Sequence, residues 1–374
     1  MNNNFITVML IALIVGLMGC MITFGVQAYK ELDNNIYSNN EIVNEENRVA
    51  TIEKKEDIET PQVVSEPIDD VQDKSTTNSV TYQSSNSSKH YFYSQLDSYS
   101  KTIYDGLAAN KDNMKTGTHK IEFGNSFDTL LSSTNGQDLL GDYYQSAIEA
   151  FTYDNPDVFY LDPTKMFLNI KTTTKGNRKT YNVYIASRNG ENYLASGFGS
   201  AQIINQCQAQ INQTKNQVLS GLTGNTEKKI KHIHDYLVDN ITYDQTLSGA
   251  NIYNLYGALV NKSCVCEGYA KAFKYLLDEA GIENVIVIGT GTNSKGETEN
   301  HAWNYVAISG NWYAVDVTWD DPVIQGGGML LSSYKYKYYL KGFTSISKDH
   351  IANGQFTTGG KIFSYPNISN TDYK

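Results

Sequence analysis

The apolar residues of the chain are distributed differently along three successive regions. An almost unbroken apolar run covers residues 5–26, and residues 29–89 then carry only sparse apolar positions without regular spacing. From residue 90 onward, apolar residues recur at periods typical of helices and strands. The pattern therefore predicts a folded part, residues 90–374, preceded by a polar segment and an apolar amino terminus.

The first block of the folded part, residues 90–222, predicts a mixture of helices and strands. Apolar positions three and four residues apart predict helices, and short runs of apolar residues bounded by turn residues predict strands. The predicted elements are helices over 91–107, 143–153 and 204–222 and strands over 166–171 and 180–187. We find no motif with chemistry of its own in this block, and we interpret it as an accessory α+β region.

The second block, residues 223–374, predicts two helices followed by a pair of strands. One helix begins near Thr226, and another begins near Cys266 and stops before Gly281. The runs 301–308 and 312–319 predict strands joined by a two-residue turn. This block contains every residue to which we assign chemistry.

Cys266 lies at the predicted start of the second of these helices. The amide N–H groups of a first helical turn lack intrahelical partners, and together with the helix dipole they favour a thiolate over a thiol. The same amides are able to hold a developing oxyanion. Gly268 leaves one side of the turn without a side chain, so that another backbone or a substrate can approach. Cys266 is therefore a candidate nucleophile, although many free cysteines are buried and inert.

His301 and Asp316 are placed within reach of each other by the predicted strand pair. A turn at residues 309–310 sets Trp303 opposite Asp316 and His301 opposite Thr318. His301 and Asp316 are then diagonal neighbours on one face, whereas a register shift of one residue would put them on opposite faces. A carboxylate in that position can bond one imidazole nitrogen and leave the other directed at a thiol.

Three separated motifs carry a resemblance to a known family. They are Cys-Glu-Gly-Tyr-Ala at 266–270, His-Ala-Trp-Asn at 301–304 and Asp-Val-Thr-Trp-Asp-Asp-Pro at 316–322. With these motifs, residues 226–350 resemble the transglutaminase-like superfamily of papain-related cysteine enzymes. The resemblance implies an α+β fold in which the nucleophile helix packs on an antiparallel sheet, with Cys266 as nucleophile, His301 as general base and Asp316 as its partner. It does not fix the reaction, because relatives include transglutaminases, peptidases, amidases and inactive members.

Three further cysteines bear on the choice of nucleophile. Cys20 lies in the apolar run, whereas Cys207 and Cys264 lie in the folded part. Cys264 precedes the predicted helix and would gain less from its dipole, so Cys266 is the preferred nucleophile. Cys264 could pair with Cys207 or oxidise with Cys266. A zinc site of Cys264, Cys266 and His301 would reuse the catalytic set and lacks the ligand spacing of structural zinc motifs, so we expect no metal and no cofactor.

Three further polar or aromatic features are expected to have structural roles. His232 and His234 are two residues apart on a predicted helix, where side chains at that spacing do not share a face. We therefore expect His234 to pack and to form hydrogen bonds. Asn304 is expected either to support His301 or to face solvent. The tyrosine-rich segment 334–339 is expected to pack, or else to line a groove for a peptide or a glycan.

The amino-terminal region predicts attachment to a membrane. Residues 1–28 contain an apolar run long enough to span a bilayer, and we interpret them as an uncleaved anchor. A cleaved signal peptide ending near Ala28 and a lipoprotein signal at Cys20 are the alternatives. All three place the rest of the chain outside the cytoplasm. The positive-inside rule alone favours the opposite orientation, because Lys30 follows the run and no basic residue precedes it.

Residues 29–89 are interpreted as a disordered acidic linker. They are rich in Asn, Glu, Asp, Ser and Thr, and their few apolar residues cannot bury enough surface to fold alone. They contribute to a formal net charge of −10 for the whole chain. No segment is basic enough to suggest a nucleic-acid partner.

Together these features predict an extracytoplasmic, membrane-anchored cysteine enzyme that transfers acyl groups at amide bonds through Cys266, His301 and Asp316. Transfer to water would make it a peptidase or amidase, and transfer to an amine would make it a transglutaminase. The expected substrate is a protein or peptide, and a cell-wall peptide is one candidate because of the location. A binding or scaffold module on the same fold is the alternative, and the complete set of three residues argues against it.

Overall fold

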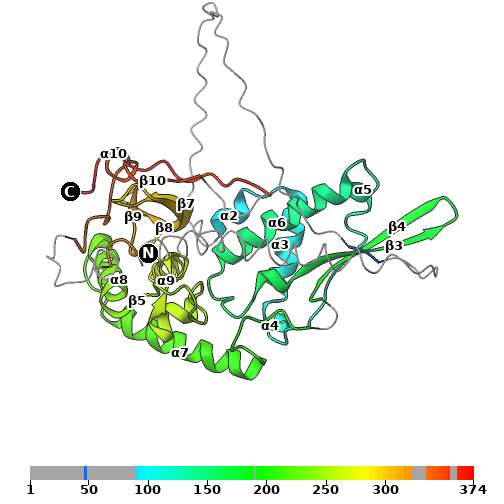
Figure 1. The fold of residues 1–374 in the computed structure, drawn as a ribbon, viewed down its shortest axis with the longest axis horizontal. Helices are drawn as coiled ribbons and strands as arrows, with labels where there is room; N and C mark the ends of the chain where they lie inside the picture. Colours follow the sequence, from blue (N-terminus) through cyan, green and yellow to red (C-terminus); the bar gives the residue numbers. More distant parts are fainter. Residues whose placement is uncertain (1–45, 49–89, 189–190, 322–333, 354–359) are drawn as a thin grey trace, which may run out of the picture.

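The computed structural model describes residues 46–48, 90–188, 191–321, 334–353 and 360–374. They form the predicted mixture of helices and sheets, with two four-stranded sheets and one two-stranded sheet (Figure 1). The predicted anchor lies outside the described residues, and so does the predicted linker except for strand β1 (Glu46–Arg48). In the described part of the chain, no helix combines the length and the apolar character needed to cross a membrane.

The sheet of the accessory region is built around a long antiparallel hairpin. β3 (Phe167–Lys175) and β4 (Arg178–Ala186) pair along their whole length, and Gly176 takes the positive φ of 59° that such a tight turn favours. β2 (Ile121–Gly124) and β1 complete the order β1-β3-β4-β2. Both predicted strands are confirmed, and each extends further towards the hairpin turn than predicted. β1 lies in the segment that we interpreted as a linker, and it pairs with β3. The sequence did not predict this strand, because three residues are too few to show an apolar period.

The helix predicted over 91–107 is two helices, α2 (Tyr91–Ser94) and α3 (Ser98–Ala109). The Asp97 carboxylate accepts hydrogen bonds from the amides of Tyr99 and Ser100 and so caps the start of α3. Apolar positions continue across this break, which is why their period predicted a single helix. The other two predicted helices are confirmed as α6 (Gly136–Asp154) and α7 (Ala201–Ser220). The remaining short elements are α4 (Lys111–Met114), α5 (Asp128–Leu131) and the 3-10 helix η2 (Pro163–Lys165).

The second sheet is antiparallel and has the order β10-β7-β8-β9. Its strands are β7 (Asn284–Thr292), β8 (Thr298–Ile308), β9 (Asn311–Val315) and β10 (His350–Ile351). Ile308 lies opposite Asn311, which confirms the predicted register. The turn residues Ser309 and Gly310 have φ values of 51° and 80°, and positive φ at both positions is what a type I′ turn needs. β9 ends at Val315 rather than at residue 319, because the chain turns there and the Asp320 amide bonds the Asp316 carbonyl.

The helix that begins at Cys266 packs against this sheet. The helices of the region are α8 (Thr226–Asn240), α9 (Cys266–Glu279), α10 (Phe343–Ile346) and the π-helix η3 (Gly257–Asn261). β5 (Thr242–Tyr243) follows α8 and pairs in parallel with β6 (Ser263–Cys264), which leads directly into α9. The Asn304 side chain of β8 donates a hydrogen bond of 3.1 Å to the Ala270 carbonyl of α9. Asn304 is therefore buried and ties helix to sheet, instead of supporting His301 or facing solvent as expected.

The accessory region and the region around α9 share one buried core. Phe92 of α2 packs edge-on against Phe363 near the carboxyl terminus, with 5.0 Å between ring centroids, and the Tyr91 hydroxyl donates to the Ser364 carbonyl. In Figure 1 the carboxyl-terminal segment, drawn in red, runs across the molecule from the β9 side towards α2 and α6. The end of the chain thus holds the two regions together.

Candidate active site

Asp316 is positioned by the turn that follows β9. Its side chain is fully buried, and its Oδ1 atom accepts hydrogen bonds from the amides of Thr318 at 3.0 Å and Trp319 at 3.1 Å. An aspartate that bonds amides two and three residues ahead fixes both the turn and its own rotamer. Oδ2 is left pointing into the sheet, towards β8 and β10.

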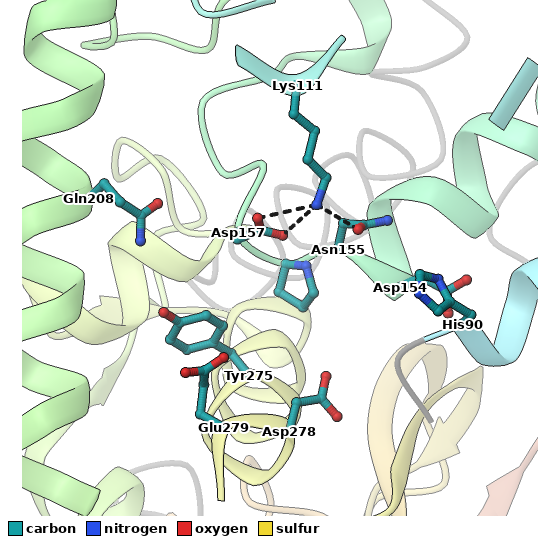
Figure 2. A pocket seen from close by; sticks show the side chains of 10 residues that line it. His90, Lys111, Asp154, Asn155, Asp157, Gln208, Tyr275, Asp278 and Glu279 are labelled. Atoms are coloured by element: carbon teal, nitrogen blue, oxygen red, sulfur yellow. Dashed lines mark hydrogen bonds and ion pairs between the residues drawn. The ribbon is translucent and has the colours of Figure 1, made fainter. Parts of the chain in front are cut away.

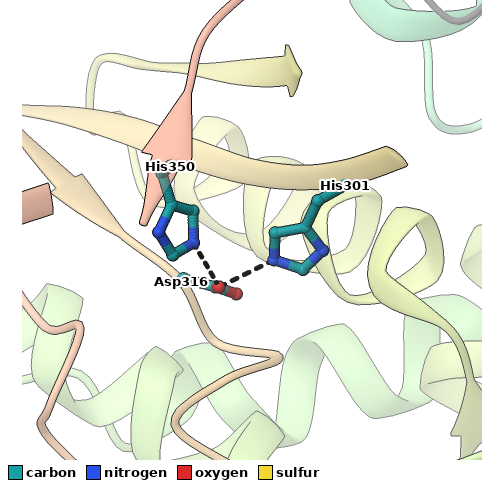
Figure 3. A group of neighbouring side chains, drawn as sticks. All are labelled: His301, Asp316 and His350. Atoms are coloured by element: carbon teal, nitrogen blue, oxygen red, sulfur yellow. Dashed lines mark hydrogen bonds and ion pairs between the residues drawn. The ribbon is translucent and has the colours of Figure 1, made fainter. Parts of the chain in front are cut away.

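His301 of β8 meets this carboxylate directly. Its Nε2 atom lies 2.8 Å from Asp316 Oδ2 (Figure 3). The ring is almost completely buried, stacked beside Trp303 with 5.8 Å between centroids and tilted against Trp319 at 5.0 Å. Because both aromatic rings pack against the imidazole, the nitrogen that faces Asp316 is fixed by packing as well as by the hydrogen bond.

The electrostatics of this pair favour two opposite charges. Burial alone would lower the pKa of His301, but the Asp316 charge and hydrogen bonds to Asp316 and Cys266 outweigh it and raise that pKa to about 10. Burial would likewise raise the pKa of Asp316, whereas the charges and hydrogen bonds of His301 and His350 hold it well below its usual range. His301 is therefore an imidazolium, and Asp316 a carboxylate, at neutral pH.

Cys266 is the first residue of α9, as the sequence predicts. It is half-buried, and its side-chain hydrogen bond to His301 contributes to the raised pKa of that imidazole. Since Nε2 of His301 faces Asp316, Nδ1 is the ring nitrogen available to the thiol. The structure therefore places His301 against Asp316, and Cys266 begins the helix that packs on the same sheet. The preceding Val265 is the N-cap residue, so the first amides of α9 have no intrahelical partners.

Cys264 lies directly beneath this turn and differs from Cys266 in its surroundings. It is fully buried, and burial, together with the charges of Cys266 and Asp321, holds the pKa of its thiol well above the usual value. A Cβ atom on Gly268 would lie 2.5 Å from Cys264 Cβ and 2.7 Å from the Ile252 carbonyl oxygen. The space beside Gly268 is therefore filled by other residues of the chain. Close approach of another backbone is confirmed, and the approach of a substrate at this glycine is wrong.

The three cysteines of the described chain are all unpaired. The disulfide between Cys207 and Cys264 that the sequence left open is therefore absent from this structure. Cys207 is buried on α7.

His350 is a member of the site that the sequence analysis missed. Its Nε2 atom lies 3.0 Å from the same Asp316 oxygen that His301 contacts, and its Nδ1 atom lies 2.7 Å from Asp349 Oδ1. It comes from β10, a strand of two residues that carries no periodic signal. Gly289 and Gly291 of β7 lie opposite His301 and His350 in the sheet and leave space there for large rings. These two glycines were the sequence feature that could have indicated a second large side chain beside His301.

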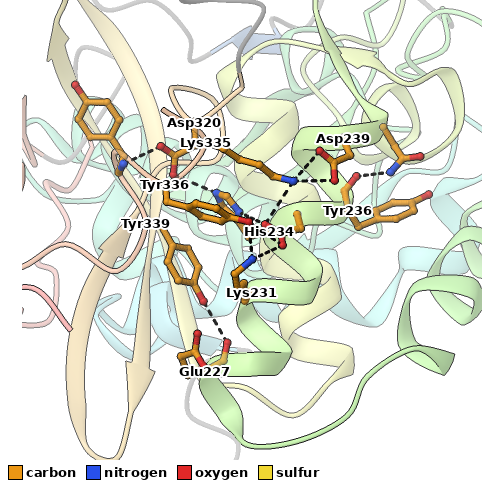
Figure 4. Close-up of polar contacts among 12 residues, drawn as sticks. Glu227, Lys231, His234, Tyr236, Asp239, Asp320, Lys335, Tyr336 and Tyr339 are labelled. Carbon is orange, nitrogen blue, oxygen red and sulfur yellow. Dashed lines mark hydrogen bonds and ion pairs between the residues drawn. The ribbon is translucent and has the colours of Figure 1, made fainter. Parts of the chain in front are cut away.

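His234 anchors the far side of the Asp316 turn. It is fully buried, with Nδ1 at 3.1 Å from Asp235 Oδ1 and Nε2 at 3.1 Å from Asp320 Oδ2 (Figure 4). The other oxygen of Asp320 accepts the Tyr338 amide at 2.7 Å. His232 instead contacts the Val218 carbonyl. The two histidines therefore face different neighbours, and His234 packs and forms hydrogen bonds as expected.

A metal is not needed to explain the arrangement around Asp316. The nearest ligand-type atoms of His301, Asp316 and His350 lie within 4.8 Å of one another, a spacing that would suit a single ion. Each of these atoms is already used in a hydrogen bond of 2.8 or 3.0 Å. The structure thus accounts for all three side chains as a hydrogen-bonded group.

A separate polar cavity of about 290 Å³ lies at the opposite end of α9 (Figure 2). Its walls include Tyr275, Asp278 and Glu279 of α9 together with residues 154–157 of the accessory region. Lys111 bridges part of it, with Nζ at 2.6 Å from Asn155 Oδ1 and 3.2 Å from Asp157. The cavity is remote from Cys266, which begins the helix, and it adds nothing to the chemistry there.

Comparison with known proteins places this site in a recognised domain. Residues 212–317 match the model of the transglutaminase-like superfamily, so this part of the chain is a transglutaminase-like domain. Two curated relatives are the kyphoscoliosis peptidase of Mus musculus, 37% identical over 67 residues, and that of Homo sapiens, 36% identical over 67 residues. Each match covers 16% of this chain and 10% of the relative, so the chain spans about a tenth of the length of these curated proteins.

Among solved structures, the chain is similar to a TGase crystal structure. The sequence identity is 14%, the TM-score is 0.29, and the match covers 46% of this chain and 48% of the other. A similarity at this level supports no conclusion about function.

Proposed function

We propose that the transglutaminase-like domain is a cysteine-dependent acyl-transfer enzyme that acts on amide bonds of proteins or peptides. The observation that carries the proposal is the placement of His301, whose Nε2 atom bonds the Asp316 carboxylate and whose pKa is raised by Cys266 as well as by Asp316. A thiol, an imidazole and a carboxylate in that order form the arrangement that activates a nucleophile and then protonates a leaving group.

The first half-reaction would use each of the three residues once. The Cys266 thiolate attacks the carbonyl carbon of the amide, and the first amides of α9 stabilise the oxyanion. The tetrahedral intermediate collapses by breaking the C–N bond, and His301 gives its Nδ1 proton to the departing amine. Asp316 keeps the other nitrogen of His301 protonated and correctly directed. The product of this step is a thioester on Cys266 and a free amine.

The second half-reaction decides the class of enzyme. Water or an amine attacks the thioester carbonyl while His301 removes its proton, and collapse expels the Cys266 thiolate. We favour hydrolysis, and hence a peptidase or amidase, because no feature of the described residues favours an amine acceptor. The curated relatives are named as peptidases, which agrees with this preference over the short segment that matches.

The location that we propose comes from the sequence alone. Residues 1–28 would anchor the chain in the cell membrane, with the domain outside the cytoplasm. Surface proteins or cell-wall peptides would then be the substrates within reach. Cleavage of the domain by an external protease on intact cells would support this location, and protection until the cells are lysed would contradict it.

A product survey would test the activity even though the substrate is unidentified. The full-length protein is incubated with a peptide library and a labelled amine, and mass spectrometry records cleavage, deamidation and amine incorporation. We expect products from the wild type and from the control Cys264→Ala, and none from Cys266→Ala. Identical products from the wild type and Cys266→Ala would overturn the proposal.

A further inference from the structure

Asp316 serves two imidazoles through a single oxygen atom. Oδ2 accepts from His301 Nε2 at 2.8 Å and lies 3.0 Å from His350 Nε2 (Figure 3). Oδ1 is occupied by two backbone amides. A carboxylate that is fully buried and accepts four hydrogen bonds has no remaining site for water. His350 therefore contacts the carboxylate as closely as the proposed catalytic base does.

The second nitrogen of His350 also faces a carboxylate. Nδ1 lies 2.7 Å from Asp349 Oδ1, and Asp349 Oδ2 accepts the Tyr338 hydroxyl at 2.8 Å. Burial would raise the pKa of Asp349, but hydrogen bonds from His350 and Tyr338 lower it, and Asp316 is likewise ionised. Both ring nitrogens of His350 are therefore directed at carboxylates, and the ring is held between Asp316 and Asp349.

We propose that His350 is a positioning residue of the active site, an imidazole that is anchored on Asp349 and holds Asp316 Oδ2 in place against His301. The inference rests on the proposed function, because it assigns His350 a role towards the group that would act as acid and base. His350 itself does not reach the substrate in this arrangement, since both of its nitrogens are used by aspartates.

The surrounding fold makes room for this second imidazole and shields it from water. Gly291 of β7 lies opposite His350, and a Cβ atom there would come within 2.9 Å of the Trp319 ring and 3.4 Å of His301 Cδ2. Trp319 covers both imidazoles, with centroid distances of 4.5 Å to His350 and 5.0 Å to His301. His301 and His350 can therefore both reach Asp316 because Gly291 carries no side chain.

The charged and titratable groups around His350 can be assigned element by element. Asp349 adjoins it at the start of β10, His301 comes from β8, Asp316 from the end of β9 and Tyr338 from the segment before α10. β7 pairs with His350 through a glycine, which carries no titratable group. His350 competes with His301 for the same oxygen of Asp316, and its removal leaves that oxygen to His301 alone. His301 should then keep its proton to higher pH.

The pH profile of Cys266 alkylation would measure this effect without a substrate. Full-length protein is treated with iodoacetamide between pH 5 and pH 12, and the rate at Cys266 is read by mass spectrometry. The upper inflection reports the loss of the His301 proton beside the thiolate. In His350→Leu, whose side chain cannot donate to Asp316, we expect this inflection to rise by about one pH unit. The matched control is His234→Leu, since His234 also bridges two aspartates that do not include Asp316, and we expect no shift.

Each outcome of this experiment decides a specific point. An unchanged inflection in His350→Leu, or an equal rise in His234→Leu, would overturn the role of His350 while leaving the proposed function intact. Equal alkylation rates of Cys266 in the wild type and in His301→Ala would overturn the proposed function and this inference with it.

A conservative variant separates loss of the hydrogen bond from loss of packing. The amide of His350→Gln can still donate to Asp316, so we expect this variant to keep the wild-type inflection. A rise as large as that in His350→Leu would contradict the proposal.

Discussion

His301 and Asp316 face each other at 2.8 Å across the end of a hairpin whose register is fixed by two residues with positive φ. Neither side chain has more than marginal contact with solvent. Removal of one partner would leave the other charge buried and uncompensated, which is far more costly than loss of an exposed ion pair. His301 and Asp316 therefore stabilise the fold and also form part of the proposed catalytic site.

The first prediction concerns Asp316→Asn. The amide keeps the size of the carboxylate but removes the charge that holds the His301 proton, so product formation should fall by about 10²- to 10⁴-fold. Initial rates with a peptide found in the product survey would measure the loss. Asp112→Asn, at an exposed position in α4, is the control and should keep wild-type rates; a similar loss in both variants would point to general damage.

The second prediction is a pH dependence of stability with a defined sign. The pKa of folded His301 is raised from its ordinary value to about 10, so its stabilising contribution is complete below about pH 6.5 and disappears as the pH rises through 10. The pKa of Asp316 is lowered, so its contribution is present above about pH 4 and is lost as the pH falls.

Urea unfolding of the wild type and His301→Gln at several pH values would test this. The difference in the free energy of unfolding between the two proteins should be largest between about pH 4 and pH 6.5 and should shrink towards pH 10. A difference that stays constant from pH 5 to pH 10 would disagree with the assigned ion pair.

The third prediction compares two glycines. In Gly268→Ala the new methyl group would meet Cys264 and the Ile252 carbonyl at 2.5 and 2.7 Å, and we expect a loss of about 1–3 kcal/mol in the free energy of unfolding. Gly199 has open space around its position and no positive φ, so Gly199→Ala should change stability by no more than about 0.5 kcal/mol. Chemical denaturation would measure both, and equal effects would be inconsistent with the close packing beneath Cys266.

The fourth prediction distinguishes the cysteines by reactivity. Under native conditions iodoacetamide should modify Cys266 at least about 100-fold faster than Cys264 and Cys207, because both of these thiols are buried and not accessible and burial also raises the pKa of Cys264. In denaturant the three rates should converge. Peptide mapping after timed quenching would give the rates, and faster native labelling of Cys264 would shift the role of nucleophile to that residue.

The parts of the site that could be predicted from the sequence depend on short-range rules. Ser309-Gly310 predicted a turn type, the turn set the register, and the register brought His301 close to Asp316. The helix start predicted the position of Cys266 equally well. In each case a few neighbouring residues contain the information, because backbone conformation at a tight turn or a helix end is decided locally.

The parts that could not be predicted depend on contacts between distant segments. His350 reaches Asp316 from a two-residue strand 34 positions further along the chain, and no period exists within two residues. The break at Asp97 was missed for a different reason, since the apolar spacing continues through it and only the cap reveals it. Gly289 and Gly291, on one face of β7, were the local sign that large side chains converge there.

The most direct test of the central claim is the rate of Cys266 alkylation at pH 6 in the wild type and in His301→Ala. An unassisted thiol is less than about one per cent thiolate at that pH and reacts slowly. We predict that the wild type reacts at least about 100-fold faster than His301→Ala, because the imidazolium stabilises the thiolate. Equal rates in the two proteins would contradict the assignment of Cys266 and His301 as a catalytic pair.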